Sequence, residues 1–320
     1  MHMSELKMNN PHLPLVTVVS PVYNSADYLE DCILSVLNQT YPNIEYIIMD
    51  GGSTDNTRAI VEKYADRLTF ISEKDRGQSD AINKGWQRAT GDIIAWLNAD
   101  DIYAPDAVEH AVTYLVNHPD TLWVYGCANF VDEHGQPNNY RYPIFEWNYD
   151  KLATFGCYIV QPTVFLRRQV IDTFGYIDET LHFGMDYEYW LRIGKQYPPA
   201  FVPDIRVTVK IFQDTKSRSG GYKRLQEISA MLARYGYADL PSTMHHQWVD
   251  AVLDNIMRHL RKGEWRALRA DWHDLHRYPK QVLRGTGKWL LRKLMPTSAE
   301  RRLRRWFVRP KKSHPDALCG

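Results

Sequence analysis

The sequence predicts an α/β fold, with a mostly parallel sheet and flanking helices in the first two thirds and a C-terminal helical appendage. Up to about residue 125, short β-branched runs alternate with stretches of helical period, the pattern of parallel strands joined by crossover helices. Residues 222–320 contain Arg, Leu and Trp at helical spacing and almost no strand signal. The glycine-containing break Ser219-Gly220-Gly221 separates the two parts.

The elements of the first part follow from these patterns. Strands are predicted at residues 15–20, 44–49, 68–72, 92–97 and 121–125. Helices are predicted at residues 26–38, 54–64, 78–89 and 105–117. Ser53 or Thr54 is expected to cap the second helix, and Pro105 to occupy the first turn of the last. Beyond residue 126 an α+β style is expected, with a hairpin turn at residues 133–136. We therefore predict a leader over residues 1–14, a main domain over 15–220 and a basic helical region over 221–320.

Charge is distributed unevenly along the chain. The net charge is only +1, but residues 258–320 contain 18 Lys and Arg against five acidic residues, so the remainder is acidic. With 44% hydrophobic residues, the chain can form a substantial core. The composition indicates an acidic globular body followed by a basic tail.

The cysteines and the N-terminus bear on the compartment. Cys32, Cys127, Cys157 and Cys319 lie far apart and form no CxxC pair, so we expect neither a disulfide framework nor a zinc site. The first fourteen residues contain no apolar h-region, and no run approaches the ~18 apolar residues of a membrane-spanning helix. We expect a reducing, cytoplasmic location.

Three predicted strands end in polar clusters, where ligands of open parallel sheets bind. These clusters are Pro21-Val22-Tyr23-Asn24, Asp50-Gly51-Gly52-Ser53-Thr54-Asp55 and Asn98-Ala99-Asp100-Asp101. None matches GxGxxG or GxxxxGK[ST], which disfavours a dinucleotide fold and a P-loop. Ordinary turn and helix-cap chemistry is the alternative interpretation of the second cluster.

The adjacent carboxylates Asp100 and Asp101 are the sharpest of these signals. They follow an apolar run and repel each other unless a cation or hydrogen-bond donors compensate. Mg²⁺ or Mn²⁺ binds one or two protein carboxylates and completes its shell with phosphate oxygens and water. The alternative is that Asp101 caps the helix near Pro105.

Five segments, in this order, resemble the family 2 glycosyltransferases, which are inverting enzymes with the Rossmann-like GT-A fold. They are TVVSPVYN, DGGSTDNT, SEKDRGQSDAINKG, AWLNADDIY and FGMDYEYWLR, and they span roughly residues 15–218. The resemblance implies a hexosyltransferase that uses a nucleotide-diphosphate sugar, UDP by default, with Mn²⁺ or Mg²⁺ as cofactor. It also implies an acceptor hydroxyl on a saccharide or lipid-linked saccharide, in cell-surface polysaccharide or glycolipid assembly.

The resemblance assigns roles on the donor side. Asp100, helped by Asp101, would hold the metal. Asn98 replaces the first aspartate of the DxD motif, so retuned nucleotide binding is expected. The implied nucleotide-binding residues are Pro21, Tyr23, Asn24, Asp50, Asp80, Asn98 and Ala99.

Asp186 is the implied general base for a single in-line displacement. It lies in the first turn of a predicted helix, whose dipole favours an ionised carboxylate, and a simple helix-start aspartate is the alternative. Met185 replaces the acid usually beside it. One turn on, Trp190 shares the face of Asp186 and is a candidate acceptor contact, with a core role as the alternative.

Weaker assignments follow from the same resemblance. Gln161 lies in a segment resembling one near the acceptor pocket, with a bare strand end as the alternative. Lys210 and Lys216 are candidate phosphate contacts in a segment where Phe212 stands in place of histidine, and solvated surface lysines are the alternative.

The basic tail interleaves Arg and Lys with Trp, Leu and Phe at residues 288–294 and 301–307, which is typical of an interfacial amphipathic helix. We expect peripheral binding to an anionic membrane surface, on the inner face of the cytoplasmic membrane. A solvated helical face that packs on the acidic body is the alternative. Nucleic-acid binding is not expected because no recognition module is present.

Two other functions compete with transfer. A noncatalytic nucleotide-sugar-binding assembly protein would explain Asn98 and Phe212. A sugar-phosphate nucleotidyltransferase would need a glycine-rich loop after the first strand, where Pro21-Val22-Tyr23-Asn24 stands instead.

Overall fold

The computed structural model describes residues 13–138, 142–212, 220–282 and 319. The chain divides into two compact units. The first comprises residues 1–149, 157–213 and 316–320, and the second comprises residues 150–156 and 214–315.

The first unit is built on one eight-stranded mixed sheet with the order β3-β2-β1-β4-β7-β6-β8-β5. β1 pairs in parallel with β2 and β4, β7 is antiparallel to β4 and β6, and β5 is antiparallel to β8. The strands are β1 (Val16–Val22), β2 (Ile44–Asp50), β3 (Thr69–Ser72), β4 (Ile93–Trp96), β5 (Asp101–Tyr103), β6 (Trp123–Val131), β7 (Phe165–Arg167) and β8 (Ala200–Lys210).

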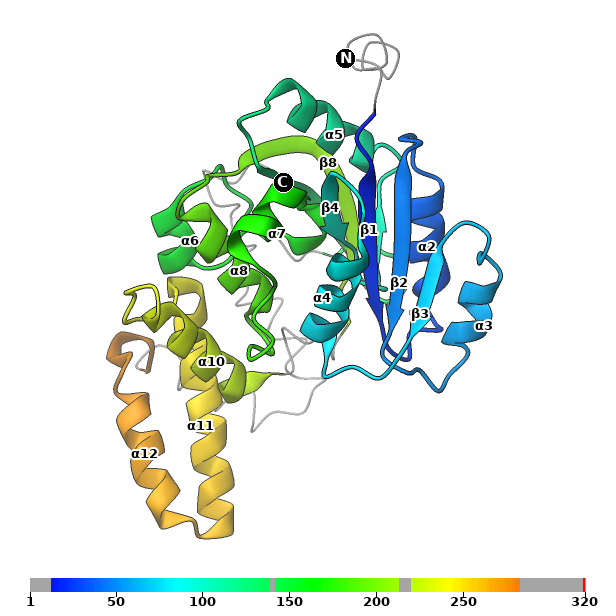
Figure 1. Ribbon diagram of the computed structural model, residues 1–320. Helices are drawn as coiled ribbons and strands as arrows, with labels where there is room; N and C mark the ends of the chain where they lie inside the picture. Colours follow the sequence, from blue (N-terminus) through cyan, green and yellow to red (C-terminus); the bar gives the residue numbers. More distant parts are fainter. Residues whose placement is uncertain (1–12, 139–141, 213–219, 283–318, 320) are drawn as a thin grey trace. The chain divides into compact units, whose positions relative to one another are not determined.

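Helices cover both faces of this sheet, with α2 and α3 on one face and α4 on the other (Figure 1). The chain order reverses between β1 and β4, and such switch points open a crevice at the carboxyl ends of the strands. The helices are α2 (Leu29–Leu37), α3 (Thr57–Glu62), α4 (Gln78–Arg88), α5 (Ala107–Asn117), α7 (Arg168–Phe174) and α8 (Met185–Gly194).

All the strands and helices predicted before residue 126 are confirmed, and each begins within three residues of its expected start. Two details are wrong. Asn56, not Ser53 or Thr54, is the N-cap residue of α3, and α5 begins at Ala107, after Pro105. The turn at residues 133–136 is confirmed by a hydrogen bond of 2.9 Å from Asp132 N–H to the carbonyl of Gln136.

Sequence reasoning missed three strands for two physical reasons. β5 and β7 have three residues each, which is too short for a recognisable alternation. β8 is eleven residues long but contains Pro203, and its pairing with β6 shifts register between Tyr125 and Cys127. An irregular strand shows no regular period of two in its side chains.

Four tryptophans from α4, β4, β6 and α8 form a buried stack in the first unit. Trp190 packs between Trp96 and Trp123, with ring centroids 5.5 and 5.4 Å apart, and Trp86 lies 5.4 Å from Trp96. Trp190 is fully buried, so its assignment as an acceptor contact is wrong. It belongs to the core and fixes α8 against the sheet.

A disulfide joins Cys127 and Cys319, whose Cα atoms are 5.9 Å apart. No disulfide framework was expected, and this single disulfide was not predicted. The two residues are 192 positions apart, so no local spacing could have revealed the pairing.

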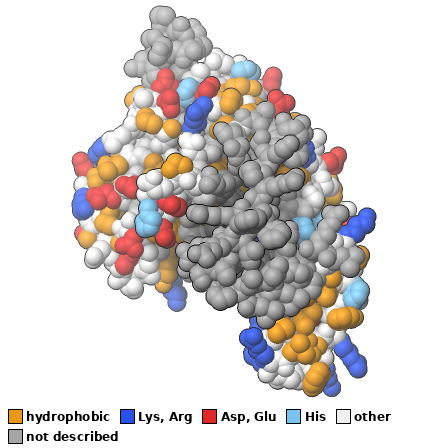
Figure 2. Space-filling view, turned by 180° about the vertical axis from the view of Figure 1, so that it is seen from behind, with side chains coloured by type: hydrophobic (Ala, Val, Ile, Leu, Met, Phe, Trp, Pro, Cys, Tyr) orange, Lys and Arg blue, Asp and Glu red, His pale blue; other side chains and the backbone are white. Residues whose placement is uncertain are grey.

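The second unit is helical, as predicted, over its described residues. It contains α10 (Gly221–Ala233), α11 (His245–Lys262), α12 (Trp265–Leu275) and α6 (Tyr149–Phe155). The first residue of α6, Tyr149, belongs to the first unit. α11 and α12 form a hairpin (Figure 1) that turns at Gly263 in the left-handed conformation. Figure 2 shows hydrophobic side chains gathered on this hairpin with Lys and Arg at their margins.

No helix in residues 13–138, 142–212 or 220–282 has the length and hydropathy needed to cross a membrane. The basic stretches 288–294 and 301–307 lie outside the described residues.

Candidate active site

The polar turns after β1 and β2 meet, as predicted from the parallel sheet. Asn24 adopts a left-handed φ of 48°, and its N–H donates to Ser53 Oγ at 2.7 Å. The N–H of Thr54 donates back to Asn24 Oδ1 at 2.8 Å. Pro21 is buried within β1, whereas the side chain of Tyr23 is 63% exposed. Tyr23 therefore presents an aromatic ring to solvent at the crevice.

Asp50 ends β2 and is held by donors from two neighbouring segments. Its carboxylate accepts from Ser53 N–H at 3.0 Å and from Ser72 Oγ at 2.6 Å. A Cβ at Gly51 would lie 2.4 Å from Asp75 Oδ2, so a larger residue would displace the Asp75 carboxylate. This packing aligns the β2 loop with the loop that follows β3.

Asp80 organises the loop before α4. It accepts from the guanidinium of Arg76 at 3.0 Å and from the Arg76 N–H at 2.9 Å, and Lys84 Nζ lies 3.3 Å away. The hydrogen bond from Arg76 lowers the pKa of Asp80 to about 2. Between them, Gly77 has a φ of 122° that disfavours other residues. Asp80 therefore fixes the conformation of the 75–77 loop.

Arg76, which pairs with Asp80, is a candidate site residue that sequence reasoning missed. Its side chain is 76% exposed, yet it is anchored by Asp80 and by Glu179 at 2.5 Å. The available signal was an arginine immediately before the glycine that opens α4, because the N-terminus of a helix attracts anions.

Asn98 is the centre of a hydrogen-bond network beyond β4. Its amide nitrogen donates to Asp101 Oδ2 at 3.0 Å and to Gln161 Oε1 at 2.9 Å. Its amide oxygen accepts from Gln78 Nε2 at 2.8 Å. Gln161 in turn donates to the carbonyl of Trp96 at 2.8 Å. Asn98 and Gln161, predicted for the nucleotide side and the acceptor side respectively, are thus brought into contact.

Gln161 does not end a strand, which corrects the alternative interpretation of that segment. Residues Gln161–Thr163 form a 3₁₀ helix, and all three are buried. The turn carries Gln161 to the carboxyl edge of the sheet, where its amide bridges Asn98 and the backbone of β4.

Asp100 and Asp101 are adjacent carboxylates, of which Asp101 is buried and Asp100 is half-buried. Burial raises the pKa of both carboxyls, and the charge of Asp100 raises that of Asp101 further. Asp101 begins β5 and caps no helix, because the N-cap residue of α5 is Asp106. That alternative is therefore wrong. Two carboxylates destabilised by burial and mutual repulsion suit a divalent cation.

The protein ligands available here limit how such a cation could bind. No group of three or more His, Cys, Asp or Glu side chains that could hold a metal occurs among the described residues. Mg²⁺ and Mn²⁺ need only one or two protein carboxylates when a substrate phosphate and water supply the remaining ligands. Asp100 and Asp101 fit a cation that arrives with a phosphorylated ligand.

Lys210 is a cation whose charge reaches Asp100. Its Nζ donates to Asp31 Oδ2 on α2 at 3.0 Å, and its positive charge offsets part of the rise that burial causes in the pKa of Asp100. Phe212, which follows β8, packs on Tyr28 with ring centroids 5.6 Å apart. Lys216 lies outside the described residues.

Asp186 occupies the first turn of α8, as predicted. Gly184 is the N-cap residue, and Asp186 Oδ1 accepts from the N–H of Tyr187 at 2.8 Å. The half-buried Cys157 thiol lies close by, since the charge of Asp186 adds to the effect of burial in raising the pKa of Cys157. Met185, in place of an acid, accepts a hydrogen bond from Ser79 Oγ to its sulfur at 2.8 Å.

The two ends of the site are joined through α4. Gln78, the first residue of α4, bonds to Asn98, and the next residue, Ser79, bonds to Met185. Asp100 is two residues from Asn98, and Asp186 is adjacent to Met185. Chain neighbours of the carboxylate pair and of Asp186 therefore contact the same end of α4.

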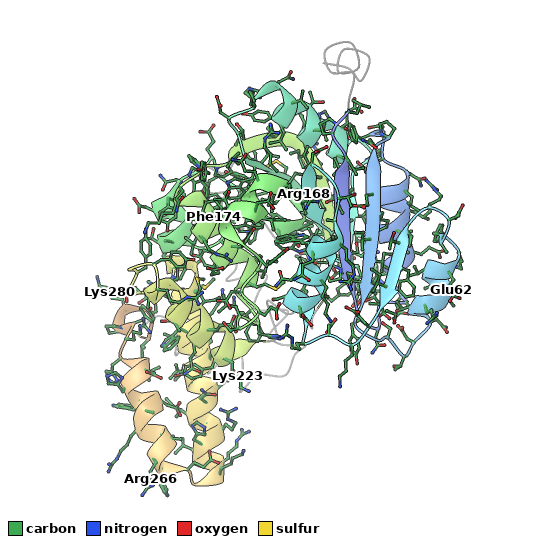
Figure 3. All side chains as sticks on the ribbon, viewed as in Figure 1. Glu62, Arg168, Phe174, Lys223, Arg266 and Lys280 are labelled. Atoms are coloured by element: carbon green, nitrogen blue, oxygen red, sulfur yellow. A yellow bond between two sulfur atoms is a disulfide. The ribbon has the colours of Figure 1, made fainter. Side chains whose placement is uncertain are left out.

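Hydrogen bonds from α7 and α8 hold these elements in place. Arg168, at the start of α7 (Figure 3), donates to the carbonyls of Ala89 and Gly91 at the end of α4. Arg192 pairs with the buried Glu188 at 3.0 Å and donates to the carbonyl of Phe174 at the end of α7. These bonds fix the helix that carries Asp186.

The sheet order, the switch point and the carboxylates beyond it define the GT-A class of glycosyltransferase folds. The mannosyltransferase PcManGT from Pyrobaculum calidifontis, solved with GDP-Man and Mn²⁺, matches with a TM-score of 0.57 at 21% identity and covers 88% of this chain and 81% of that one. S. aureus TarS 1-349, solved with UDP-GlcNAc, matches with a TM-score of 0.56 at 18% identity, over 84% and 90% of the two chains.

Residues 17–174 match the model of the glycosyl transferase family 2, which supports a glycosyltransferase of this family. A glycosyltransferase of Rickettsia typhi is 27% identical over 234 residues, which cover 69% of this chain and 71% of that protein. The amylovoran biosynthesis glycosyltransferase AmsE of Erwinia amylovora is 26% identical over 66% of this chain and 82% of its own length. Escherichia coli chondroitin synthase is 33% identical over 58% of this chain, but the match spans only 27% of that protein. A Rickettsia felis relative is likewise matched over only 36% of its length.

Proposed function

We propose that the protein transfers a hexosyl group from a nucleoside diphosphate sugar to an acceptor hydroxyl and inverts the anomeric configuration. The observation that supports this is the path through α4 that joins Asn98, beside Asp100 and Asp101, to Met185, beside Asp186. Such a reaction requires two kinds of carboxylate at one edge of the sheet. A pair holds the cation that binds the diphosphate, and a separate carboxylate takes the proton of the acceptor.

In the proposed reaction Asp186 is the general base. It takes the proton of the acceptor hydroxyl as that oxygen bonds to the anomeric carbon. The bond from this carbon to the diphosphate breaks on the opposite side, and the diphosphate leaves with the electron pair. Base catalysis of this kind contributes about 10²- to 10⁴-fold in rate.

The proposed donor residues lie at the carboxyl edge. The exposed Tyr23 ring would pack on the base, with Asn24, Asp50, Asp80 and Arg76 shaping the pocket around it. Asn98 and Ala99 would lie along the nucleotide, and Gln161 would hold the Asn98 amide in position. Lys210 and Lys216 remain the proposed phosphate contacts.

We propose Mn²⁺ or Mg²⁺ at Asp100, with Asp101 beside it. A bound divalent cation would neutralise charge on the diphosphate oxygens. The structure of PcManGT was determined in complex with Mn²⁺, which supports this proposal.

UDP is the proposed nucleotide, supported by TarS having been solved with UDP-GlcNAc. The names of AmsE and chondroitin synthase support a saccharide acceptor in polysaccharide assembly. We further propose a lipid-linked acceptor at the inner face of the cytoplasmic membrane, to which the basic C-terminal region would bind the enzyme peripherally.

Donor turnover with Mn²⁺ or with EDTA tests the reaction. Asp186→Asn is expected to bind donor normally and lose at least about 10²-fold in kcat. Asp66→Asn, which removes the same charge from an exposed position, is the matched control. Near-normal transfer by Asp186→Asn would remove Asp186 from the mechanism, and metal-independent turnover would remove the cation. A thermal-shift comparison of UDP-, GDP- and dTDP-sugars identifies the donor, because a ligand that binds the native state raises Tm.

A further inference from the structure

The free end of the α11–α12 hairpin contains no buried side chain over residues 256–270. The buried residues of α11 end at Asn255, and those of α12 are Asp271 and Leu275. The helices therefore pack on the rest of their unit at one end and extend beyond it at the other. Arg266 is at this far end (Figure 3). Residues 256–272 are called the hairpin tip below.

The hairpin tip exposes large hydrophobic side chains. Trp265 is 71% exposed, Trp272 62%, Leu260 47% and Met257 38%. They are all the exposed large hydrophobic residues described in the second unit. On α12, Trp265 and Trp272 are seven residues apart and share one face, with Arg269 between them. Figure 2 shows hydrophobic side chains gathered on the hairpin, and an exposed apolar patch of this kind marks an interaction site.

The same tip is strongly basic. It contains Arg258, Arg261, Lys262, Arg266 and Arg269 against two acids, Glu264 and Asp271. Asp271 is buried and lies 2.5 Å from His259 Nδ1, so Glu264 is the one exposed acid in residues 256–272. Figure 2 shows the result, with hydrophobic side chains bordered by Lys and Arg.

We propose that the hairpin tip docks on an anionic lipid bilayer. Tryptophan and leucine insert at the level of the lipid headgroups, while arginine and lysine bind the lipid phosphates around them. A second copy of the chain is a poorer occupant, because two tips face to face would oppose five cations with five cations. An acidic protein would satisfy the charges, but it would leave unexplained a surface centred on exposed tryptophans.

The proposed function places the acceptor at a membrane, and docking of the hairpin tip would bring the enzyme to that membrane. The biological role of docking rests on the proposed function, but its physical evidence does not. Its evidence is the hairpin tip, not the segment after residue 282. The vesicle assay below contains neither donor nor acceptor. Failure of docking would therefore leave the transfer reaction standing, and a failure of transfer would leave docking intact.

Flotation of the full chain with phosphatidylcholine vesicles, with and without phosphatidylglycerol, tests the proposal. Binding is expected only with the anionic lipid and is expected to weaken with salt. Arg261→Glu with Arg266→Glu is expected to lose at least about five-fold in affinity per residue. Trp265→Ala is expected to lose about ten-fold, because an aromatic ring is no longer removed from water.

Matched controls come from exposed residues of the first unit. Arg58→Glu with Lys63→Glu repeats the charge reversal, and Tyr176→Ala repeats the loss of an exposed ring. Both controls are expected to bind anionic vesicles as the unaltered chain does. If the hairpin variants also bind normally, another segment carries membrane binding and the proposal is wrong.

Trp265→Phe separates insertion from a structural role. This variant should still float with anionic vesicles, because phenylalanine also inserts, but should lose part of the blue shift in tryptophan fluorescence. An undiminished blue shift would show that Trp265 stays in water, against the proposal. Light scattering without lipid tests whether the hairpin tip binds a second copy of the chain instead. Dimers that Trp265→Ala abolishes would assign the tip to such an interface.

Discussion

The amide of Asn98 donates a hydrogen bond of 2.9 Å to Gln161, although the two residues are 63 positions apart. The same amide nitrogen also donates to Asp101 at 3.0 Å. An aspartate at position 98 would match the DxD motif more closely, but it would have no proton to give to either partner. The amide at this position therefore suits the network into which it is built.

Asn98→Asp is expected to lower the free energy of unfolding by about 1–3 kcal/mol, because it brings a third carboxylate beside Asp100 and Asp101 and breaks two donated bonds. Urea unfolding with and without Mn²⁺ is the measurement, and added Mn²⁺ should recover part of the loss. Asn129→Asp, at an exposed position of β6, supplies the control. Unchanged stability without metal would show that the Asn98 donors contribute nothing.

The sequence allowed much of the sheet and of the site to be predicted, because both follow local rules. Asn24 and Ser53 follow the adjacent parallel strands β1 and β2, so their contact needed only the strand order. Trp190 could not be placed in the core from the sequence, since its helical spacing from Asp186 suited both roles and only the opposing Trp96 and Trp123 decide between them. Long-range pairings such as Cys127 with Cys319 leave no periodic trace.

Asp100→Asn is expected to leave the metal-free protein as stable as before or more stable. Burial raises the pKa of Asp100, which means that the charged carboxylate is less stable in the fold than in water. The same substitution should abolish the rise in Tm produced by Mn²⁺ together with a nucleoside diphosphate. Thermal unfolding checks both effects, with Asp66→Asn as the control. A full Mn²⁺-dependent rise in Asp100→Asn would place the cation elsewhere.

Arg76→Ala is expected to flatten the loss of stability at acid pH. The pKa of Asp80 is depressed to about 2 from 3.8, so its contribution is fully present above pH 3.8 and is lost as the pH falls toward 2. Because Arg76 is 76% exposed, solvent screening limits this contribution to about 1 kcal/mol. Urea unfolding between about pH 5 and about pH 2 should show the unaltered chain and Arg76→Ala converging. Arg58→Ala, which breaks an exposed i,i+4 pair, should run parallel to the unaltered chain, and a parallel Arg76→Ala curve would contradict the assignment.

Glu188→Gln and Asp186→Asn, two positions apart on α8, are expected to fail in opposite ways. Glu188 is buried and pairs with Arg192 at 3.0 Å, and Arg192 also holds the ends of α7 and α8 together. Loss of its charge leaves Arg192 without a carboxylate partner and should lower the free energy of unfolding by about 2–4 kcal/mol. Molecules that remain folded should keep a normal kcat, because Glu188 does not face the site.

Asp186→Asn should instead unfold at nearly the same urea concentration as the unaltered chain and lose kcat. Measuring unfolding and single-turnover transfer on both variants separates a residue that holds α8 in place from one that acts on the acceptor. If Glu188→Gln lost kcat without losing stability, the proton would pass through Glu188 instead, and the role proposed for Asp186 would be wrong.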